Sequence, residues 1–146
     1  MNRPPDLKCF YTMHINRPVD IALLLLRLTF GGLMLINHGW KKMLKFFGDD
    51  PIQFADPLGL GDTTSLALAV FAEVVCAVLV MIGLFTRWAV VPLIITMLVA
   101  IFIVHIDDPF KKMESAILFL VPYICLLLAG AGRYSLDAQR GLIAPR

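Results

Sequence analysis

Four long runs of apolar residues, separated by short polar segments, account for most of the chain. They span about residues 20–43, 65–85, 88–105 and 114–131. A helix of about 20 residues is about 30 Å long, close to the thickness of the hydrocarbon core of a bilayer. A helix that is apolar on every side needs a large core to bury it, and a chain of 146 residues cannot supply one for four such helices. The pattern therefore predicts a single domain, an all-α membrane protein folded as an up-down four-helix transmembrane bundle.

The segments between these runs predict how the helices connect. Residues 86–88 form a very tight turn, so the second and third helices should be antiparallel neighbours. The connection over residues 44–64 is the longest. Its Phe47, Ile52 and Phe54 predict that it lies on the membrane surface or covers the mouth of the bundle. Ahead of the first run, residues 1–18 are predicted to form an extended arm or a short surface helix.

Composition agrees with a membrane protein and excludes several other classes. The chain is 59% hydrophobic and 16% charged, with a mean hydropathy of +0.80. Its net charge of +2 without a long basic cluster argues against binding to nucleic acid. Three cysteines with no CxxC pair argue against a disulfide framework or a thiol-exchange site. The N-terminus lacks the order of a cleavable signal, so the first helix is expected to remain as a membrane anchor.

The distribution of basic residues predicts the orientation in the membrane. The end of the bundle that holds both termini carries Arg3, Lys8, Arg17, Arg87, Arg133, Arg140 and Arg146. The opposite end carries Lys41, Lys42, Lys45, Lys111 and Lys112. Because basic residues accumulate on the cytoplasmic side, this modest excess predicts that both termini are cytoplasmic.

Glu73 is the one charged residue in the second apolar run. An ionised carboxylate that faces lipid costs several kcal/mol, so such a residue usually faces the bundle interior, a partner or a water-filled cavity. Ala69, Cys76 and Ala77 share its helical face, and small residues of this kind allow helices to approach closely. Glu73 is therefore a candidate functional residue. The alternative is a protonated Glu73 that joins two helices through a structural hydrogen bond.

Four further ionisable residues fall in or beside the apolar runs. Arg27 and His38 are eleven residues apart, which places them about 20° from each other around one helix. Counting along the helices puts His38 and His105 near the boundary opposite the termini, with Glu114 at the same level and Glu73 about 12 Å deeper. Arg27 could instead extend to the nearer headgroups, and His38 could be an interfacial residue that bonds to water.

The chemistry of these residues leaves three interpretations open. Histidines and carboxylates are suitable metal ligands, and His38 with His105 could hold a haem, although an axial offset of roughly 9 Å would exclude Glu73 from the ligand set. A second interpretation is a pocket for a quinone, in which a histidine donates a hydrogen bond and Glu73 relays protons. The third is structural, with hydrogen bonds that hold the bundle together or dock a partner.

Three stretches of the chain resemble the DoxX family of small bacterial membrane proteins. They read RLTFGGLMLINHGWKKM, FAEVVCAVLVMIGLFTRW and GRYSLD, and His105 follows the third apolar run. The likeness covers about residues 22–137.

The resemblance implies a four-helix protein of the bacterial inner membrane. Relatives in the family include a subunit of a thiosulfate:quinone oxidoreductase and proteins linked to oxidative-stress or quinone-related redox complexes. It implies a membrane subunit that uses a quinone and is completed by a partner redox protein or by a homo-oligomer. A non-catalytic scaffold or assembly factor is the alternative. The polar site carried over by matching positions comprises Arg27, His38, Glu73, His105 and Glu114.

Overall fold

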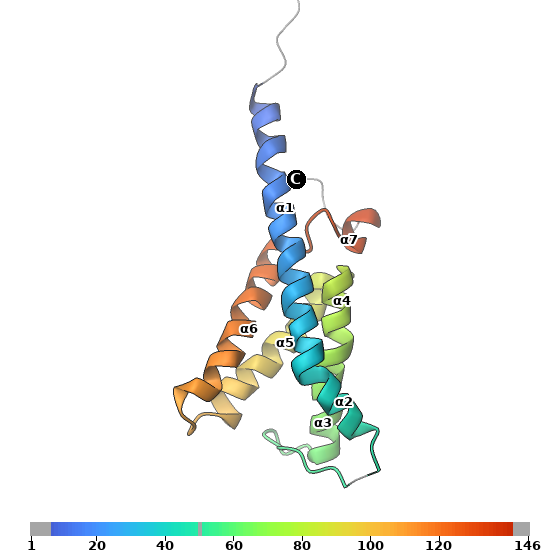
Figure 1. Cartoon of the computed structure of the whole chain (residues 1–146), viewed down its shortest axis with the longest axis vertical. Coiled ribbons are helices and arrows are strands. Elements are labelled where there is room, and N and C mark those ends of the chain that lie inside the picture. The colour runs from blue at the N-terminus through green and yellow to red at the C-terminus, as the bar shows by residue number, and fades with distance from the viewer. Residues whose placement is uncertain (1–6, 50, 142–146) are drawn as a thin grey trace, which may run out of the picture.

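The computed structural model describes residues 7–49 and 51–141, with side chains from residue 17 onward. All regular structure in these ranges is helical (Figure 1). Four helices within them are long and apolar enough to cross a membrane: Arg17–Phe46, Asp62–Ile82, Thr86–Val104 and Phe110–Ala129. Their ends agree with the predicted apolar runs to within four residues. The predicted all-α membrane fold is therefore confirmed.

Three of the four membrane helices contain a wider, π-helical segment. The first consists of α1 (Leu7–Met34), η1 (Leu35–Gly39) and α2 (Trp40–Phe46), and the second of α3 (Asp62–Val70), η2 (Phe71–Cys76) and α4 (Ala77–Ile82). The third consists of α5 (Thr86–Val99) and η3 (Ala100–Val104), the fourth is α6 (Phe110–Ala129), and the short helix α7 (Leu136–Gln139) follows. Such segments are rare and are often found at functional sites.

The first helix extends further toward the N-terminus than the sequence predicts. It begins at Leu7 and continues through Pro18, so the prediction of a separate arm or surface helix is wrong for residues 7–18. Residues 1–6 lie outside the described residues. Adding residues to an existing helix avoids the cost of nucleation, which lets the membrane helix propagate beyond the bilayer.

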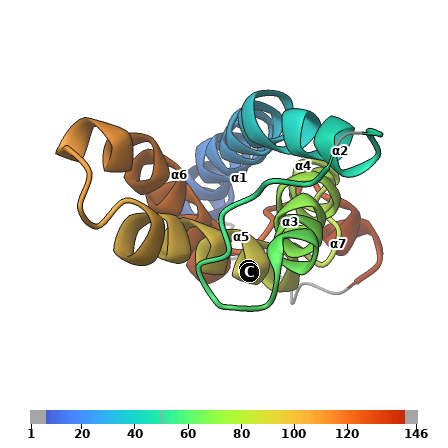
Figure 2. The ribbon, with the colours of Figure 1, turned by 90° about the horizontal axis from the view of Figure 1, so that it is seen from below.

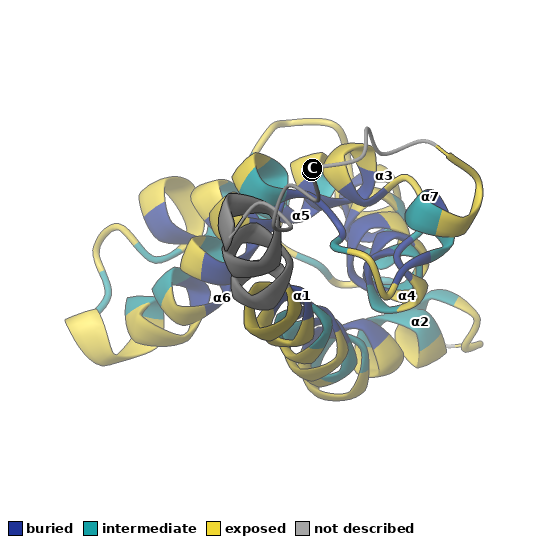
Figure 3. Ribbon diagram, turned by 90° about the horizontal axis from the view of Figure 1, so that it is seen from above, coloured by how far each residue is buried: buried dark blue, intermediate teal, exposed yellow. Residues whose placement is uncertain are grey.

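The helices pack as two pairs that meet at one end of the bundle. The α1 helix packs mainly on α4, and α5 packs mainly on α6. The pairs lie close together at the end that carries the chain termini, called here the terminal end. They diverge toward the opposite end, called the loop end, where the loop between α2 and α3 lies (Figure 1). Seen from the terminal end, the buried faces of α1, α4 and α5 point toward one another (Figure 3).

The tail after α6 folds back onto the turn between α4 and α5. The Asp137 carboxylate accepts hydrogen bonds from the amides of Phe85 (2.7 Å) and Thr86 (3.0 Å), and the Asp137 amide donates to the Gly83 carbonyl (2.9 Å). Asp137 thereby satisfies N–H groups at the start of α5, which have no partner within the helix. The turn lies at residues 83–85 and not at the predicted 86–88, but α4 and α5 are antiparallel neighbours as predicted.

Two side chains of α1 complete this attachment of the tail. Arg27 is fully buried, and its Nη2 donates to the carbonyl of Tyr134. Asp20 accepts a hydrogen bond from the Arg133 amide (3.0 Å). We call Asp20, Arg27, residues 83–86 and residues 132–137 the terminal clasp, because together they join α1, α4, α5 and the tail.

A substitution at Gly83 tests how much the terminal clasp contributes to stability. Its backbone is left-handed (φ +70°), and a Cβ atom there would lie 1.9 Å from Nη1 of Arg27. Gly83→Ala should therefore combine a backbone cost of about 1–2 kcal/mol with an overpacking cost of about 1–3 kcal/mol. Gly59→Ala is the matched control, because Gly59 has a similar φ of +68° but no atom within 4 Å of the added Cβ.

Unfolding of both variants in mixed detergent micelles, followed by tryptophan fluorescence, gives the comparison. The Gly83 variant should lose clearly more stability than the Gly59 variant. Equal losses would show that contact with Arg27 contributes nothing beyond the backbone conformation.

Candidate functional site

A cavity of about 520 Å³ lies where the two helix pairs diverge. Its walls come from η1 and α2, from α3 and η2, from α5 and η3, from α6, and from the loop between α2 and α3. Most of the lining side chains are apolar. His38, Lys42, Glu73 and His105 are the ionisable residues on the membrane helices and their ends that line it, and Lys112 joins them from the start of α6.

An ion pair between the buried Glu73 and the partly exposed Lys42 is the main polar feature of this cavity. Glu73 lies in η2 and is 1% exposed, and its Oε1 is 2.5 Å from Nζ of Lys42 in α2. Hydrogen bonds between two charged groups are stronger than those between neutral groups. The second oxygen of Glu73, Oε2, has no hydrogen-bond partner among the described residues. The carboxylate thus has one oxygen bound by a cation and one buried oxygen whose hydrogen-bonding capacity is unused.

Gly39 explains how these two residues reach each other. A Cβ atom at residue 39 would lie 2.5 Å from the carbonyl oxygen of Glu73, so the backbones of η1 and η2 are in direct contact there. Lys42 follows Gly39 by three residues, almost one helical turn. The small residue in the HGWKK stretch therefore allows the approach that places the Lys42 ammonium beside Glu73.

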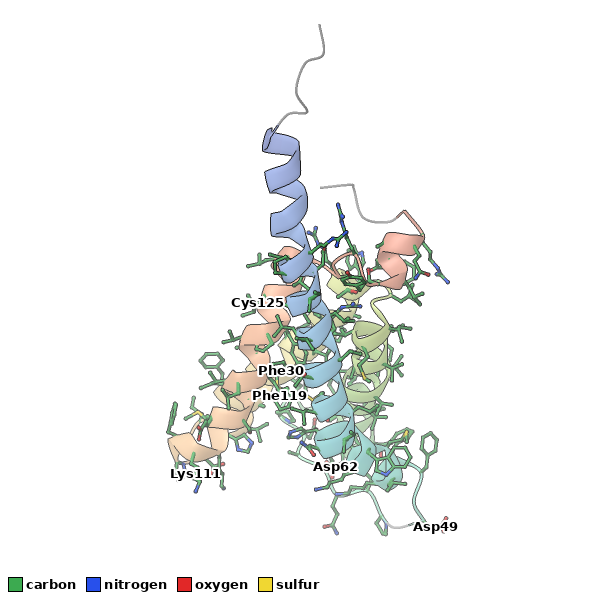
Figure 4. All side chains as sticks on the ribbon, turned by 45° about the horizontal axis from the view of Figure 1, so that its top comes forward. Phe30, Asp49, Asp62, Lys111, Phe119 and Cys125 are labelled. Carbon is green, nitrogen blue, oxygen red and sulfur yellow. The ribbon has the colours of Figure 1, made fainter. Side chains whose placement is uncertain are left out.

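Aromatic side chains form the wall next to this ion pair. The His38 ring meets the ring of Phe119 edge to face, with 5.5 Å between the ring centroids. Phe119 also meets Phe30 of α1 at 5.9 Å, and the two lie between α1 and α6 (Figure 4). The Tyr123 ring stacks on the Phe119 ring, and the Tyr123 hydroxyl donates to the Phe30 carbonyl at 3.2 Å. His38 is close enough to Glu73 and Lys42 to interact electrostatically with both.

His105 lies at the rim of the cavity in a second polar group. Its Nδ1 is 2.8 Å from Oδ2 of Asp108, and Nζ of Lys112 is 2.7 Å from Oδ1 of the same carboxylate. These hydrogen bonds, that of Lys112 first, lower the pKa of Asp108 from its usual range. Because Asp108 occupies Nδ1, Nε2 is the ring nitrogen of His105 that a ligand in the cavity could use.

The structure separates the five residues predicted from the sequence. His38, Glu73 and His105 line the same cavity. Glu114 is exposed and does not line it, although its neighbours Ser115 and Ala116 do. Arg27 belongs to the terminal clasp. It shares a helical face with His38, but eleven residues correspond to about 16 Å along the axis, so a shared face did not mean a shared site.

The predicted depth of Glu73 relative to His38 is wrong. Contact between Gly39 and Glu73 puts the two residues at one level, whereas counting from the apolar boundaries gave an offset of roughly 9 Å. His38 had been counted from the opposite boundary. Counted from the loop end, His38 lies eight residues before Phe46 and Glu73 eleven residues after Asp62, a difference of only about 4.5 Å.

Lys42 is the site residue that the sequence analysis missed. It was used only as one of the basic residues that predict the orientation in the membrane. Its spacing from His38, four residues, was the available signal, because residues i and i+4 share one face of a helix.

Metal ligands were the other chemistry considered for these residues. Within residues 17–49 and 51–141, no three His, Cys, Asp or Glu side chains come together as ligands of one ion. In the same part of the chain, Cys76 is a buried free thiol and Cys125 an exposed one.

The loop between α2 and α3 passes across the loop end of the bundle (Figure 2). Phe54, Pro57 and Leu58 of this loop line the cavity, so it occupies one of the two positions predicted for it. The Asp56 carboxylate holds the loop in shape by accepting from the Ser65 hydroxyl (2.7 Å) and from the amides of residues 60 and 61 (2.9 and 2.8 Å). Nζ of Lys42 lies 5.6 Å from the centre of the Phe54 ring, a cation–π contact that links the loop to the ion pair.

Comparison with known proteins identifies the family. The family model described as DoxX matches residues 22–106, more than half of the chain. The protein belongs to the DoxX family. The matched region contains His38, Lys42, Glu73 and His105, whereas α6 and most of the terminal clasp lie beyond it.

Two relatives of this DoxX protein are similar over most of their length. An uncharacterized protein of Haemophilus influenzae is 30% identical over 128 residues, which cover 83% of this chain and 90% of the relative. An uncharacterized membrane protein of Mycobacterium tuberculosis is 31% identical over 142 residues, which cover 87% of this chain and 85% of the relative. No solved structure matches the chain significantly. The family, the relative from M. tuberculosis and the four apolar helices agree that this is a membrane protein.

The ion pair can be tested with a double-mutant cycle. Lys42→Met leaves the Glu73 carboxylate buried without a counter-charge and should lower the free energy of unfolding by about 2–4 kcal/mol. Adding Glu73→Gln removes that charge, so the double variant should regain much of the loss, with a coupling energy of about 1–3 kcal/mol. Lys41→Met is the control, because Lys41 is exposed. A coupling energy near zero would show that the pair contributes no mutual stabilisation.

Acid should loosen the loop that covers the cavity. The hydrogen bond from Ser65, followed by that from the Gly61 amide, lowers the pKa of Asp56. Stability from a lowered pKa is fully present above the unfolded value of about 3.9, and it disappears as the pH falls through the lower folded value. A spin label on Leu60→Cys, in a chain without its other cysteines, should therefore be restrained at neutral pH and become mobile only at a pH below the usual pKa range of an aspartate.

Asp56→Asn provides the comparison for this titration. Its label should be mobile at every pH, because an amide cannot accept the same set of hydrogen bonds as a carboxylate. A label that stays restrained in Asp56→Asn would mean that other contacts hold the loop.

Proposed function

We propose that this DoxX-family protein is the membrane subunit of a quinone-linked redox system in the bacterial inner membrane, with both termini in the cytoplasm. The cavity would bind the quinone ring, with the Lys42–Glu73 pair and the two histidines as its polar contacts. The observation that carries the proposal is the ion pair of Lys42 with the buried Glu73 on the wall of a mostly apolar cavity.

The residues present fit a quinone. Small-molecule sites are typically apolar cavities of about 300–1,000 Å³ with a few placed polar groups, and the cavity of about 520 Å³ falls within that range. Carbonyl oxygens on opposite sides of a quinone ring need hydrogen-bond donors. Lys42 and His38 offer donors at the inner wall. His105 at the rim gives its Nδ1–H to Asp108, so Nε2 of the neutral ring is an acceptor, which suits a hydroxyl of the reduced quinol. Phe119 and Phe54 add aromatic surfaces on which a flat ring can stack.

A bound quinone would supply two-electron redox chemistry that is coupled to protons, and the chain would handle the protons. Glu73 can hold a proton at Oε2, the oxygen that Lys42 leaves unbonded. Lys42 positions the carboxylate and balances its charge when the proton leaves. The loop over residues 47–61 limits the access of water to these groups, which strengthens every electrostatic interaction between them.

Electrons would come from a partner redox protein. None of the side chains that line the cavity carries electrons, so the proposal assigns this DoxX protein the roles of binding the quinone and moving protons. In a homo-oligomer, each copy would bind quinone and move protons in the same way and would receive its electrons from the same partner.

A non-catalytic scaffold or assembly factor is the second candidate. The terminal clasp favours it, because there Arg27, Asp20 and Asp137 serve only to join segments of the chain. The Lys42–Glu73 pair could act in the same way at the loop end.

Quinone content decides between the two candidates. Protein that is purified from membranes in mild detergent should contain about one quinone per chain by mass spectrometry of the organic extract. Glu73→Gln should lose that quinone or lose quinone-dependent turnover with the partner, because Oε2 can no longer hold an exchangeable proton. The matched control is Glu114→Gln, the same chemical change at an exposed residue outside the cavity.

Two results would contradict the quinone proposal or the role of Glu73 in it. An unaltered protein that retains no quinone and binds none on addition, while remaining folded, would favour the scaffold. Equal quinone content and turnover in Glu73→Gln and Glu114→Gln would remove Glu73 from the proposed role.

A further inference from the structure

Several residues line the cavity and are also exposed at the outer surface of the bundle. Leu68 of α3 is 52% exposed, Phe71 of η2 is 50% exposed and Ile95 of α5 is 54% exposed, yet all three belong to the cavity wall. Half-exposed side chains that also line the cavity indicate that the cavity is open to the surface between them. We call the surface between these residues and Val99, which lies one turn beyond Ile95, the lateral opening.

Helix packing explains why an opening exists there. The α5 helix packs against η2 and α4, whereas no extensive contact joins it to α3. The second and third membrane helices therefore separate toward the loop end. Pro92 lies on the cavity side of α5, and the hydroxyl of Thr96 donates to its carbonyl at 2.9 Å, so this wall presents few free polar groups.

Depth places the lateral opening inside the membrane. Leu68 and Phe71 follow the start of the second membrane helix by six and nine residues, which corresponds to about 9 and 14 Å. Glu73 lies about 16 Å from the same start, near the middle of this helix of 21 residues. The opening and the ion pair are therefore at similar depths, and all of the residues around the opening are apolar.

The remaining exposed part of the cavity rim has the opposite character. Lys112 and Ser115 are exposed there, and His105 with its partner Asp108 lies beside them. The loop segment from Phe54 to Leu58 covers the adjoining loop end. Water and protons can reach this polar rim, but an apolar chain would gain nothing from lying across it.

We propose that the cavity is loaded from the membrane through the lateral opening, and that its ligand is an amphiphile with one long apolar chain and a small uncharged head that carries carbonyl or hydroxyl oxygens. The head lies against His38 and the Lys42–Glu73 pair. The chain leaves through the lateral opening, because a cavity of about 520 Å³ is of the size that holds a drug-sized molecule and not a whole lipid. This inference extends the proposed quinone function by naming the entry route and the class of chain.

The test compares two quinones on protein in lipid nanodiscs. One probe is a benzoquinone that carries only methyl substituents, and the other has the same ring with a decyl chain. Leu68→Trp and Ile95→Trp fill the opening and should each weaken binding of the decyl quinone at least tenfold, while the affinity for the methyl quinone changes less than twofold. The control is Leu128→Trp, since Leu128 is 73% exposed on α6 and does not line the cavity. Partitioning of the decyl quinone into lipid is the same in every sample and cancels in the comparison.

A second readout keeps this inference separate from the quinone function. A long-chain alcohol with a diazirine on its chain is incorporated into phosphatidylcholine vesicles with the protein, and cross-links are mapped by mass spectrometry. We expect labels on Ala72, Met97 and Phe119, which are 2%, 6% and 9% exposed and line the cavity, so lipid outside the bundle cannot reach them. Leu68→Trp should remove these labels, and the smaller change Ile95→Ala should retain them.

Each outcome is decisive for the lateral opening. Labels confined to the outer surface, or decyl-quinone affinity unchanged by both tryptophan variants, would overturn it even if quinone binds. Labels on the three buried residues together with an absence of quinone binding would support the opening and remove the quinone function.

Discussion

In the hydrocarbon core of a membrane, a charged group needs a partner within the protein, and the bundle is organised around meeting that requirement at two places. At the terminal end, Arg27 is satisfied in part by the main chain of the tail. At the loop end, Glu73 is satisfied in part by Lys42. The first contact joins α1 to the tail, and the second joins the first two membrane helices. The polar groups that are costly to bury therefore determine which parts of the chain lie together.

The two polar groups lead to different local architectures. The terminal clasp joins α1, α4, α5 and the tail through hydrogen bonds between their side chains and main chain. The ion pair joins only the first two membrane helices, so the third and fourth are free to lean away. The divergence of the helix pairs, and hence the cavity, follows from this asymmetry (Figure 1).

The fold could be predicted from the sequence because apolar length alone decides which segments cross a membrane, and all four helices were located in this way. The grouping of polar residues was harder. His38, Glu73 and His105 were selected as a site and do line one cavity, but Arg27 and Glu114, which the family resemblance added to it, lie elsewhere. Lys42 was missed because lysines after an aromatic residue usually mark the membrane boundary. The π-helical segments η1 and η2, which carry His38 and Glu73, leave no recognisable pattern in the residue order.

The position of Asp137 has a consequence for how the chain is made. The turn between α4 and α5 is fixed by a carboxylate that lies 52 residues after Phe85, beyond the last membrane helix. Chains are synthesised from the N-terminus at about 5–20 residues per second, so the first three helices enter the membrane seconds before their fastening exists. During that interval the second and third helices are held together only by side-chain packing. Emergence of Asp137 then completes this attachment, so the turn is fastened only after the fourth membrane helix has been made.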